Sequence, residues 1–516
     1  MPAIPGRRRG RLRLRLLALL LVPLTAAAAP AAAPRAAHAS VGISQHRGLD
    51  TCSAPTVAQM QAFWNNTPFW NIGIYIGGQL RGCAQPNLTS SWLQQVGPNG
   101  IGWQFLPIWV GPQAPCSGFQ TTFAWDPGTA YQQGRNEALA AYRTAVNLGM
   151  SVQDAPITYD LEAFNSADPN CVSAAQWFIQ GWVDQLHVPV AQLAGVYGSS
   201  CASALAAFAS LNPAPDYIWA ANWDNNPSTQ SLSCVSSGLW SNHQRHKQYA
   251  GGHNETWNGV TLNVDSDCSD GPVYPGPDSL STVDGCTAAA AAVTDAALVA
   301  PNFGWALRNG RLLGSRDGGG TWTDLTPAAA GSLQAAFFHD PAHGWVAWAQ
   351  NGTLYVARTV DGGHLWQTSA MPEMADVASV RLAFGSNGVG GLLATRVSSA
   401  SFSLADLYTT DDGGATWRGR PAPASGQLAV AADGRISVTG GVDGASRYSS
   451  VDAGAHWTRQ PSVQAGTGPD ATAQSNRWAL VTASRCLSGK TNCATTTTVQ
   501  STTDGGRTWH QILGPA

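Results

Sequence analysis

Two carboxylates, Asp160 and Glu162, stand two positions apart at the end of the apolar segment Pro156-Ile-Thr-Tyr-Asp-Leu-Glu162. If this segment is a β-strand, both carboxylates point to one face and the apolar side chains around them point to the other. Residues two apart on a strand are separated by roughly 6.5 Å, so the charge of one carboxylate raises the pKa of the other. Such a pair can supply a general acid and an electrostatic partner for cleaving a glycosidic bond. We predict Glu162 as the acid and Asp160 as its partner.

Further polar residues are expected at other strand ends. Asp50 ends the first apolar stretch, Asn222 stands near the end of the sixth, and Asp265 ends the eighth. The predicted catalytic residues are Asp50, Asp160, Glu162 and Asp265. The spacing also fits substrate-assisted hydrolysis, in which an Asp polarises the acetamido group of the substrate and no enzyme nucleophile attacks.

Eight short apolar stretches separated by helical or loop segments must position these residues, and this alternation is typical of an α/β fold. The expected strands are Gly48 to Cys52, Ile72 to Gly77, Gly102 to Val110, Pro156 to Glu162, Leu193 to Tyr197, Tyr217 to Trp223, Lys247 to Tyr249 and Val260 to Asp265. Helical patterns cover Thr56 to Trp64, Gly134 to Leu148, Ala174 to Leu186 and Cys201 to Ala209. We predict an α/β (β/α)8 TIM-type barrel with its active site at the C-terminal strand ends. The alternative, an open doubly wound sheet, lacks a Gly-x-Gly-x-x-Gly turn.

The last third of the chain repeats the pattern Ser/Thr-x-Asp-x-Gly-x-x-Trp five times, with 44, 51, 40 and 52 residues between successive Asp positions. A period of this size indicates a repeated supersecondary unit. The pattern resembles the Asp-box of sialidases and related β-propellers, where it joins the third and fourth strands of a blade. We therefore expect an all-β propeller of about five blades, or six if one has lost its turn. The Asp side chains serve the turns.

The first 39 residues have the features of a signal peptide: an Arg-rich start, the apolar run from Leu16 to Ala29 and a cleavage site at Ala37-His38-Ala39. This run is shorter than the roughly 20 residues that a membrane-spanning helix needs. Without this segment the chain has 21 Lys+Arg against 31 Asp+Glu, which makes nucleic acid an unfavourable partner. All 10 Cys follow the segment, as disulfides formed after export would require. We predict a secreted or cell-envelope protein with no membrane span after signal cleavage.

The expected domains are a signal peptide at 1–39, the barrel at 40–275, a linker at 276–292 and the propeller at 293–516. The linker is rich in Pro, Gly and Ala, and Cys286 is expected to tie it back to the barrel. Cys486 and Cys493 are close enough in sequence to clip one loop. The scattered Cys and His residues give no metal-binding spacing, so we predict neither a metal nor a cofactor.

Several motifs of the first domain resemble a bacterial glycoside-hydrolase-like domain related to the family 25 glycoside hydrolases, the muramidase-type lysozymes. They are Gly48-Leu-Asp-Thr-Cys52, Ile72-Gly-Ile-Tyr-Ile-Gly-Gly78, Pro107-Ile-Trp-Val-Gly-Pro-Gln-Ala-Pro-Cys116, Pro156-Ile-Thr-Tyr-Asp-Leu-Glu162, Gly195-Val-Tyr197, Ile218-Trp-Ala-Ala-Asn-Trp223 and Gln248-Tyr249. The resemblance implies a TIM-type barrel with acidic residues at the ends of strands one, four and eight. We predict substrate contacts from motif residues Tyr75, Gln113, Tyr197, Asn222, Trp223 and Gln248.

Three functions follow from these residues. The first is a hydrolase of cell-envelope or other N-acetylated glycans, such as peptidoglycan, acting through Glu162 and Asp160. The second is a non-catalytic protein whose barrel and propeller recognise envelope glycans. The third is a phosphodiester hydrolase that holds a divalent metal with Asp50, Asp160 and Asp265. Sialidase chemistry in the propeller is not expected, because the chain has no Phe-Arg-Ile-Pro motif.

Overall fold

The computed structural model describes residues 41–514 except 151–154, 189–190, 277, 279–285, 287–292, 351, 372–376, 387, 443, 461–476 and 489–490. The predicted signal peptide and most of the predicted linker lie outside the described residues. Within the described part of the chain, no helix is long and apolar enough to cross a bilayer.

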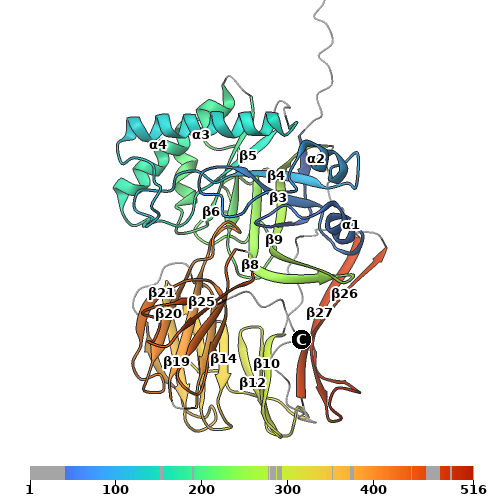
Figure 1. Ribbon diagram of the computed structural model, residues 1–516, viewed down its shortest axis with the longest axis vertical. Coiled ribbons are helices and arrows are strands. Elements are labelled where there is room, and N and C mark those ends of the chain that lie inside the picture. Colours follow the sequence, from blue (N-terminus) through green and yellow to red (C-terminus); the bar gives the residue numbers. More distant parts are fainter. Residues whose placement is uncertain are drawn as a thin grey trace, which may run out of the picture. The chain divides into compact units, whose positions relative to one another are not determined.

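Eight strands close a barrel in the first half of the chain (Figure 1). They are β2 (Arg47–Asp50), β3 (Asn71–Gly77), β4 (Gln104–Trp109), β5 (Pro156–Asp160), β6 (Leu193–Ser199), β7 (Tyr217–Ala221), β8 (Arg245–Trp257) and β9 (Val260–Val273). Strands β2 to β8 are parallel to their neighbours in chain order, and β9 pairs antiparallel with both β8 and β2. A short strand, β1 (Gly42–Ser44), adds to β9. The expected α/β barrel is confirmed.

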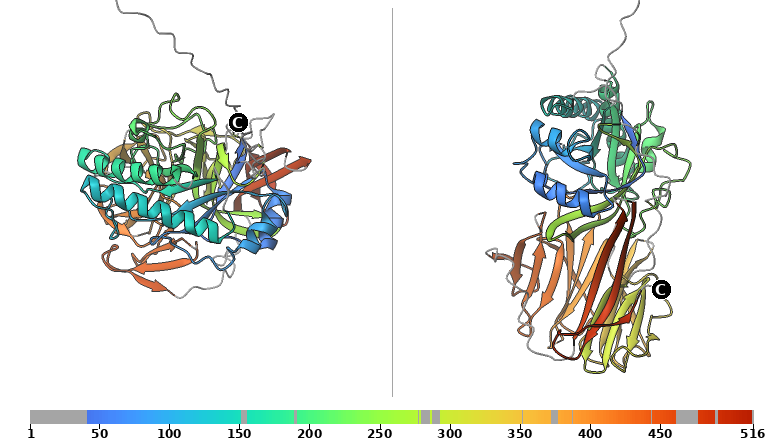
Figure 2. Two further views of the ribbon diagram at one scale, coloured as in Figure 1. Left: turned by 90° about the horizontal axis from the view of Figure 1, so that it is seen from above. Right: turned by 90° about the vertical axis from the view of Figure 1, so that its right-hand side faces the viewer.

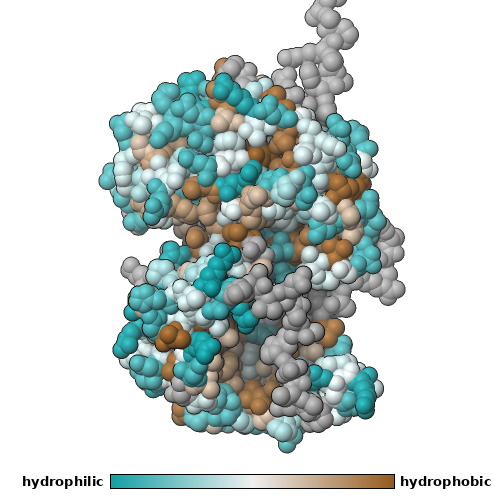
Figure 3. All heavy atoms as spheres, in the orientation of Figure 1, coloured by the Kyte–Doolittle hydropathy of each residue, from teal (hydrophilic) through white to brown (hydrophobic). Residues whose placement is uncertain are grey.

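Helices follow the early strands and cover the barrel. They are α1 (Val57–Asn66), α2 (Ser90–Val96), α3 (Pro127–Asn147), α4 (Pro169–His187) and the 3-10 helix η1 (Leu205–Ser210). Helices α3 and α4 lie side by side (Figure 2). Two glycines allow this close approach, because a side chain at Gly134 would collide with the backbone of Phe178, and one at Gly181 with that of Tyr131. Hydrophilic residues predominate on the face of these two helices seen in Figure 3.

The last two barrel strands differ from the expected strand–helix repeat. Strands β8 and β9 form one long antiparallel hairpin, in which Trp257 pairs with Val260. The two connecting residues, Asn258 and Gly259, have φ angles of 48° and 78°. Positive φ at both central positions is the type I′ turn that Asn-Gly favours between antiparallel strands. The eighth strand is therefore antiparallel, and the fold is a mixed barrel rather than a fully parallel one.

Four disulfides hold the loops of the barrel. They join Cys52 to Cys83, Cys116 to Cys171, Cys201 to Cys234 and Cys268 to Cys286. The last of these confirms that Cys286 ties the linker region to the barrel. The backbone register of the final hairpin pairs Cys486 with Cys493, whose side chains lie outside the described residues. Disulfides at this density indicate an extracytoplasmic location.

Five antiparallel sheets follow, each of them a blade of a propeller. The first has β10 (Val293–Ala300), β11 (Phe303–Arg308), β12 (Arg311–Ser315) and β13 (Thr323–Asp324), and the second has β14 (Ala335–Phe338), β15 (Gly344–Gln350), β16 (Thr353–Thr359) and β17 (Gln367–Ala370). The third has β18 (Val377–Phe384), β19 (Gly390–Arg396), β20 (Ala405–Thr410) and β21 (Arg418–Ala422), and the fourth has β22 (Gly426–Val430), β23 (Ile436–Gly440), β24 (Ser446–Ser450) and β25 (Thr458–Gln460). The fifth has β26 (Arg477–Ser488), β27 (Thr491–Thr502) and β28 (His510–Leu513).

Each Asp-box forms the turn into the outer strand of its blade. In the first blade, Asp317 accepts hydrogen bonds from the backbone N–H of Thr321 (2.8 Å) and the Ser315 hydroxyl (2.8 Å). Gly319 has a φ of 103°, which a residue with a side chain rarely adopts. Trp322 donates its ring N–H to the carbonyl oxygen of Ile512 in the fifth blade. This copy of the repeat therefore builds its own turn and also connects the first blade to the last.

Candidate functional site

The four predicted catalytic carboxylates lie together at one end of the barrel. Asp50 ends β2, Asp160 ends β5 with Glu162 two residues later, and Asp265 stands in β9 directly opposite Asp50. Their exposed fractions are 0 %, 0 %, 1 % and 3 %. On the other face of β5, Tyr159 packs against Phe178 and Trp182 of α4. The period of two expected for this strand therefore holds, with apolar side chains toward the helices.

Gln248 connects two of these carboxylates. Its Nε2 donates to Oδ2 of Asp50 and to Oδ2 of Asp265, both at 2.9 Å. Its Oε1 accepts from the hydroxyl of Tyr197 (2.9 Å) and the ring N–H of Trp223 (2.7 Å). Three of the predicted substrate-contact residues thus form one network with Asp50 and Asp265.

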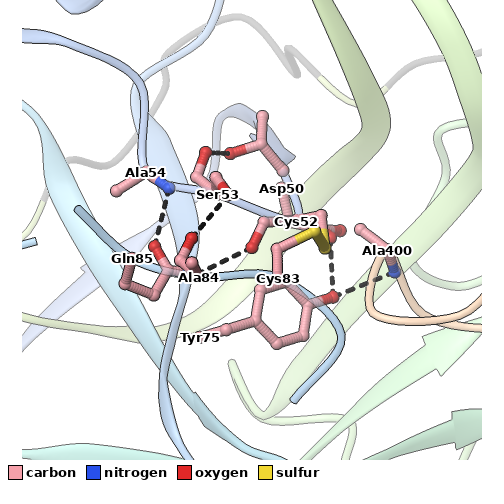
Figure 4. The surroundings of a disulfide bond; sticks show 10 residues. Asp50, Cys52, Ser53, Ala54, Tyr75, Cys83, Ala84, Gln85 and Ala400 are labelled. Atoms are coloured by element: carbon pink, nitrogen blue, oxygen red, sulfur yellow. Dashed lines mark hydrogen bonds between the residues drawn. A yellow bond between two sulfur atoms is a disulfide. The ribbon is translucent and has the colours of Figure 1, made fainter. Parts of the chain in front are cut away.

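Tyr75 also holds Asp50, and Gln113 holds the backbone that carries Asp160 and Glu162. The Tyr75 hydroxyl donates to Oδ1 of Asp50 at 2.9 Å (Figure 4). Gln113 Nε2 donates to the carbonyl oxygen of Asp160 (2.9 Å), and its Oε1 accepts from the backbone N–H of Glu162 (2.8 Å). Gln113 therefore binds the backbone of the segment that carries the carboxylate pair, and this fixes the backbone positions of Asp160 and Glu162.

Asn222 belongs to a neighbouring network. Its Oδ1 accepts from the Ser200 hydroxyl (3.0 Å) and from the backbone N–H of Ser233 (2.7 Å), and its Nδ2 donates to Asp224 (2.9 Å). Asp224 also accepts from the ammonium group of Lys247 (2.8 Å). The side chain of Asn222 thus orders the loop beside the Cys201–Cys234 disulfide.

Burial changes the acidity of the whole cluster. Burial raises the pKa of Glu162 to about 7, against hydrogen bonds led by the backbone N–H of Ser399. Burial, followed by the charge of Glu162, raises the pKa of Asp160 well above its usual range. Burial raises the pKa of Asp50 to about 6 although Gln248 and Tyr75 donate to it, and burial and the charge of Asp50 raise that of Asp265. Such a cluster retains protons near neutral pH.

Asp267 is a fifth buried carboxylate that the sequence analysis missed. Its Oδ1 accepts from the ring N–H of Trp219 (3.0 Å), and its exposed fraction is 0 %. Burial and the charge of Asp50 raise its pKa well above the usual range. Continuing the period of two past Asp265 would have found it, because β9 runs on to Val273 instead of ending at Asp265.

The propeller contributes a further part of the site. Residues 397–403, here called the serine loop, make up all but the last residue of the connection from β19 to β20 of the third blade. The Ser399 hydroxyl donates to Oδ2 of Asp160 (2.6 Å), and its backbone N–H donates to Oε1 of Glu162 (2.8 Å). The backbone N–H of Ala400 donates to the Tyr75 hydroxyl at 3.0 Å (Figure 4). No sequence motif pointed to this segment.

A cavity of about 340 Å³ lies beside the serine loop. From the barrel it is lined by Trp223, His253, Asn263 and Asp265, and from the propeller by Arg381 and Thr395 among others. Its lining combines an aromatic ring, amides and charged groups, a mixture of apolar and polar contacts that is common in small-molecule pockets. The cavity thus adjoins the carboxylate cluster at Asp265.

Residues 61–269 match a family model described as "Rv2525c-like, glycoside hydrolase-like domain". This range is less than half of the chain; it contains Asp160, Glu162 and Asp265 and begins after Asp50. No curated protein matches the chain. The barrel is therefore similar to a glycoside hydrolase-like domain.

Several solved structures are similar to parts of the chain. A family 25 glycosyl hydrolase from Bacillus anthracis has 11 % identity and a TM-score of 0.27, over 43 % of this chain and 88 % of that chain. The catalytic domain of endolysin ply40 from bacteriophage P40 of Listeria monocytogenes has 18 % identity and a TM-score of 0.28, over 43 % and 92 %. YCF48 bound to D1 peptide has 18 % identity and a TM-score of 0.27, over 43 % and 81 %. Likenesses at these TM-scores carry no argument about activity.

Proposed function

We propose that the barrel hydrolyses glycosidic bonds in cell-envelope or other N-acetylated glycans, with Glu162 as general acid and Asp160 as its stabilising partner. The observation that carries this proposal is the buried carboxylate pair at the C-terminal end of β5, in which the pKa of Glu162 is raised to about 7. A carboxyl group with this pKa is partly protonated at neutral pH and can donate its proton to a leaving oxygen. The family match over residues 61–269 supports glycan binding by the same domain.

The pair divides its roles through a shared proton. Two carboxylates this close resist ionising together, so one keeps a proton while the other carries the charge. Burial raises the pKa of both groups, that of Asp160 well above its usual range, so the pair keeps a proton. In the state that reacts we place this proton on Glu162, and the ionised Asp160 then stabilises positive charge that develops on the sugar ring or polarises the acetamido group of the substrate. Gln248 and Tyr75 hold the Asp50 carboxyl group within the cluster, and its charge adds to the stabilisation when it is ionised.

Reducing-end release from purified peptidoglycan and from chitin-type oligosaccharides tests this proposal. The full chain is compared with Glu162→Gln, which keeps the shape of the side chain but has no acidic proton to transfer to a leaving group. We expect Glu162→Gln to lower release by about 100-fold or more while glycan binding and the fold are retained. Equal release by the two proteins, above the release of a protein-free control, would overturn the assignment.

A second function, glycan recognition without turnover, is favoured by one observation. Ser399 of the propeller binds both carboxylates of the pair, and the exposed fractions of Asp160 and Glu162 are 0 % and 1 %. A protein of this kind binds wall material in a saturable way and releases no product, and Glu162→Gln then changes nothing in the release assay. Release by the full chain that is lost in Glu162→Gln excludes it.

A further inference from the structure

The serine loop donates hydrogen bonds to three acceptors of the barrel. A hydroxyl and two backbone N–H groups of Ser399 and Ala400 meet Asp160, Glu162 and Tyr75 at 2.6, 2.8 and 3.0 Å. Hydrogen bonds to carboxylates are stronger than those between neutral groups, and these lie within the ordinary length range. A connection between two strands of a blade has no need of such contacts with another domain.

The serine loop is also buried, unlike most connections between strands. Its serines 398, 399 and 401 have exposed fractions of 4 %, 2 % and 2 %. Val397 joins an apolar cluster with barrel residues Tyr75 and Trp219. The Phe402 ring lies 4.9 Å from that of Phe119. Apolar contacts thus flank the hydrogen-bonded residues on both sides.

The donors of the serine loop match those of one class of sugar. Ser399 presents a hydroxyl O–H and a secondary amide N–H to neighbouring carboxylates. A 2-acetamido sugar carries the same two donors, a ring hydroxyl and the N–H of its acetamido group. The serine loop and such a sugar would therefore compete for Asp160 and Glu162.

We propose that the serine loop is an intramolecular plug that occupies the sugar position at the mouth of the barrel, so that the chain is a latent hydrolase until the loop is displaced. The claim that the loop fills this position is supported by the contacts themselves, whereas the claim that it keeps a hydrolase inactive rests on the proposed function. The cavity beside Asp265 remains open with the plug in place, so a glycan can reach that part of the site first.

A single added carbon atom tests the plug. A Cβ at Gly82 would collide with the carbonyl oxygen of Ser401, so Gly82→Ala must displace the serine loop without touching any carboxylate. Gly128→Ala is the matched control, because its Cβ would meet only Oδ2 of Asp126, at 3.5 Å. Hydrogen exchange of the 397–403 amides in the full chain is the readout, with circular dichroism to check the fold.

We expect slow exchange in the unmodified protein and in Gly128→Ala, and exchange at least about tenfold faster in Gly82→Ala. Exchange of the serine loop as fast as that of exposed turns in the unmodified protein would overturn the plug. Ser399→Asp is a second way to displace the loop if Gly82→Ala fails to fold, because it places a third carboxylate beside Asp160 and Glu162. Unchanged protection in a folded displacing variant would also overturn the plug.

Reducing-end release from peptidoglycan then separates the plug from the proposed function. We expect Gly82→Ala to release at least about tenfold more product than the unmodified protein, and Gly82→Ala/Glu162→Gln to release none. Faster exchange of the serine loop in Gly82→Ala without product release would support the plug but overturn the proposed hydrolase function. Equal release by the unmodified protein and Gly82→Ala, with the loop protected in the former, would overturn the latency.

Discussion

The barrel and the propeller both hold Asp side chains with serine or threonine hydroxyls, yet with opposite effects on acidity. Asp160 is buried, and burial raises its pKa well above the usual range although Ser399 donates to it. Asp317 is open to solvent, and the backbone N–H of Thr321, together with nearby hydroxyls, lowers its pKa to about 2. Desolvation outweighs the hydrogen bond in the first case and is almost absent in the second. Burial therefore separates proton chemistry from turn formation in this chain.

The largest expected effect concerns the partner carboxylate. In the Gly82→Ala background, we expect Asp160→Asn to lower reducing-end release by about 100-fold, because the negative charge beside the sugar is lost. Asp317→Asn makes the same chemical change in the propeller and should leave release within about twofold. Similar losses in the two variants would show that the comparison between the regions is wrong.

The second largest effect is expected on stability, when the side chain of Gln248 is removed. Gln248→Ala leaves Asp50 and Asp265 without a shared donor in a buried place, which should destabilise the chain by about 3 kcal/mol. The exposed residue Gln95 on α2 supplies the control Gln95→Ala, with an expected change within about 0.5 kcal/mol. Urea unfolding followed by tryptophan fluorescence measures both, and a Gln248→Ala value as small as the control would contradict the role of the network.

The pH dependence of stability should run in opposite directions in the two regions. The folded state holds the Glu162 proton more tightly than the unfolded chain, so this contribution is complete below pH 4.5 and is lost as pH rises through about 7. The loss is about 3 kcal/mol, from the shift of the pKa from 4.5 to about 7. Asp317 contributes in the reverse sense, because its lowered pKa adds stability above the usual range that disappears as pH falls toward about 2.

Unfolding by denaturant at about pH 4 and about pH 8 tests the pH-dependent contribution of Glu162 to the stability of the chain. Glu162→Gln removes the titrating group, so its stability should vary less between the two pH values than that of the unmodified protein. If the stability of the variant changed between the two pH values as much as that of the unmodified protein, the raised pKa would not belong to Glu162.

The smallest effect is expected in a single Asp-box turn. Asp317→Ala removes the acceptor of the Thr321 N–H and should lower the midpoint of thermal unfolding by about 3 °C, with no change in reducing-end release. Differential scanning calorimetry would show it. A loss of release in this variant would give the Asp-boxes a part in the chemistry that our account denies them.

Local sequence patterns predicted the features that are set by residues close together in the chain, such as strand faces and turns. The alternation in 156–162 placed Asp160 and Glu162 on the face opposite the helices, and the Asp-box repeat predicted the blades. The direction of β9 was missed, although Asn258-Gly259 is a strong hairpin signal, and Asp267 was missed with it. The bond between Ser399 and Asp160 joins residues 239 positions apart, and no periodicity in the sequence connects them. Contacts of this kind depend on how two domains meet, which a local pattern does not record.

The most direct test of the account is reducing-end release from peptidoglycan by Gly82→Ala, compared with the same protein carrying Glu162→Gln or Asp317→Asn. These two substitutions replace a carboxyl group by an amide in the buried cluster and in the exposed turn. We predict release by Gly82→Ala and by the protein with Asp317→Asn, and none with Glu162→Gln. Release that persists with Glu162→Gln would contradict the claim that the buried carboxylate is the acid of this barrel.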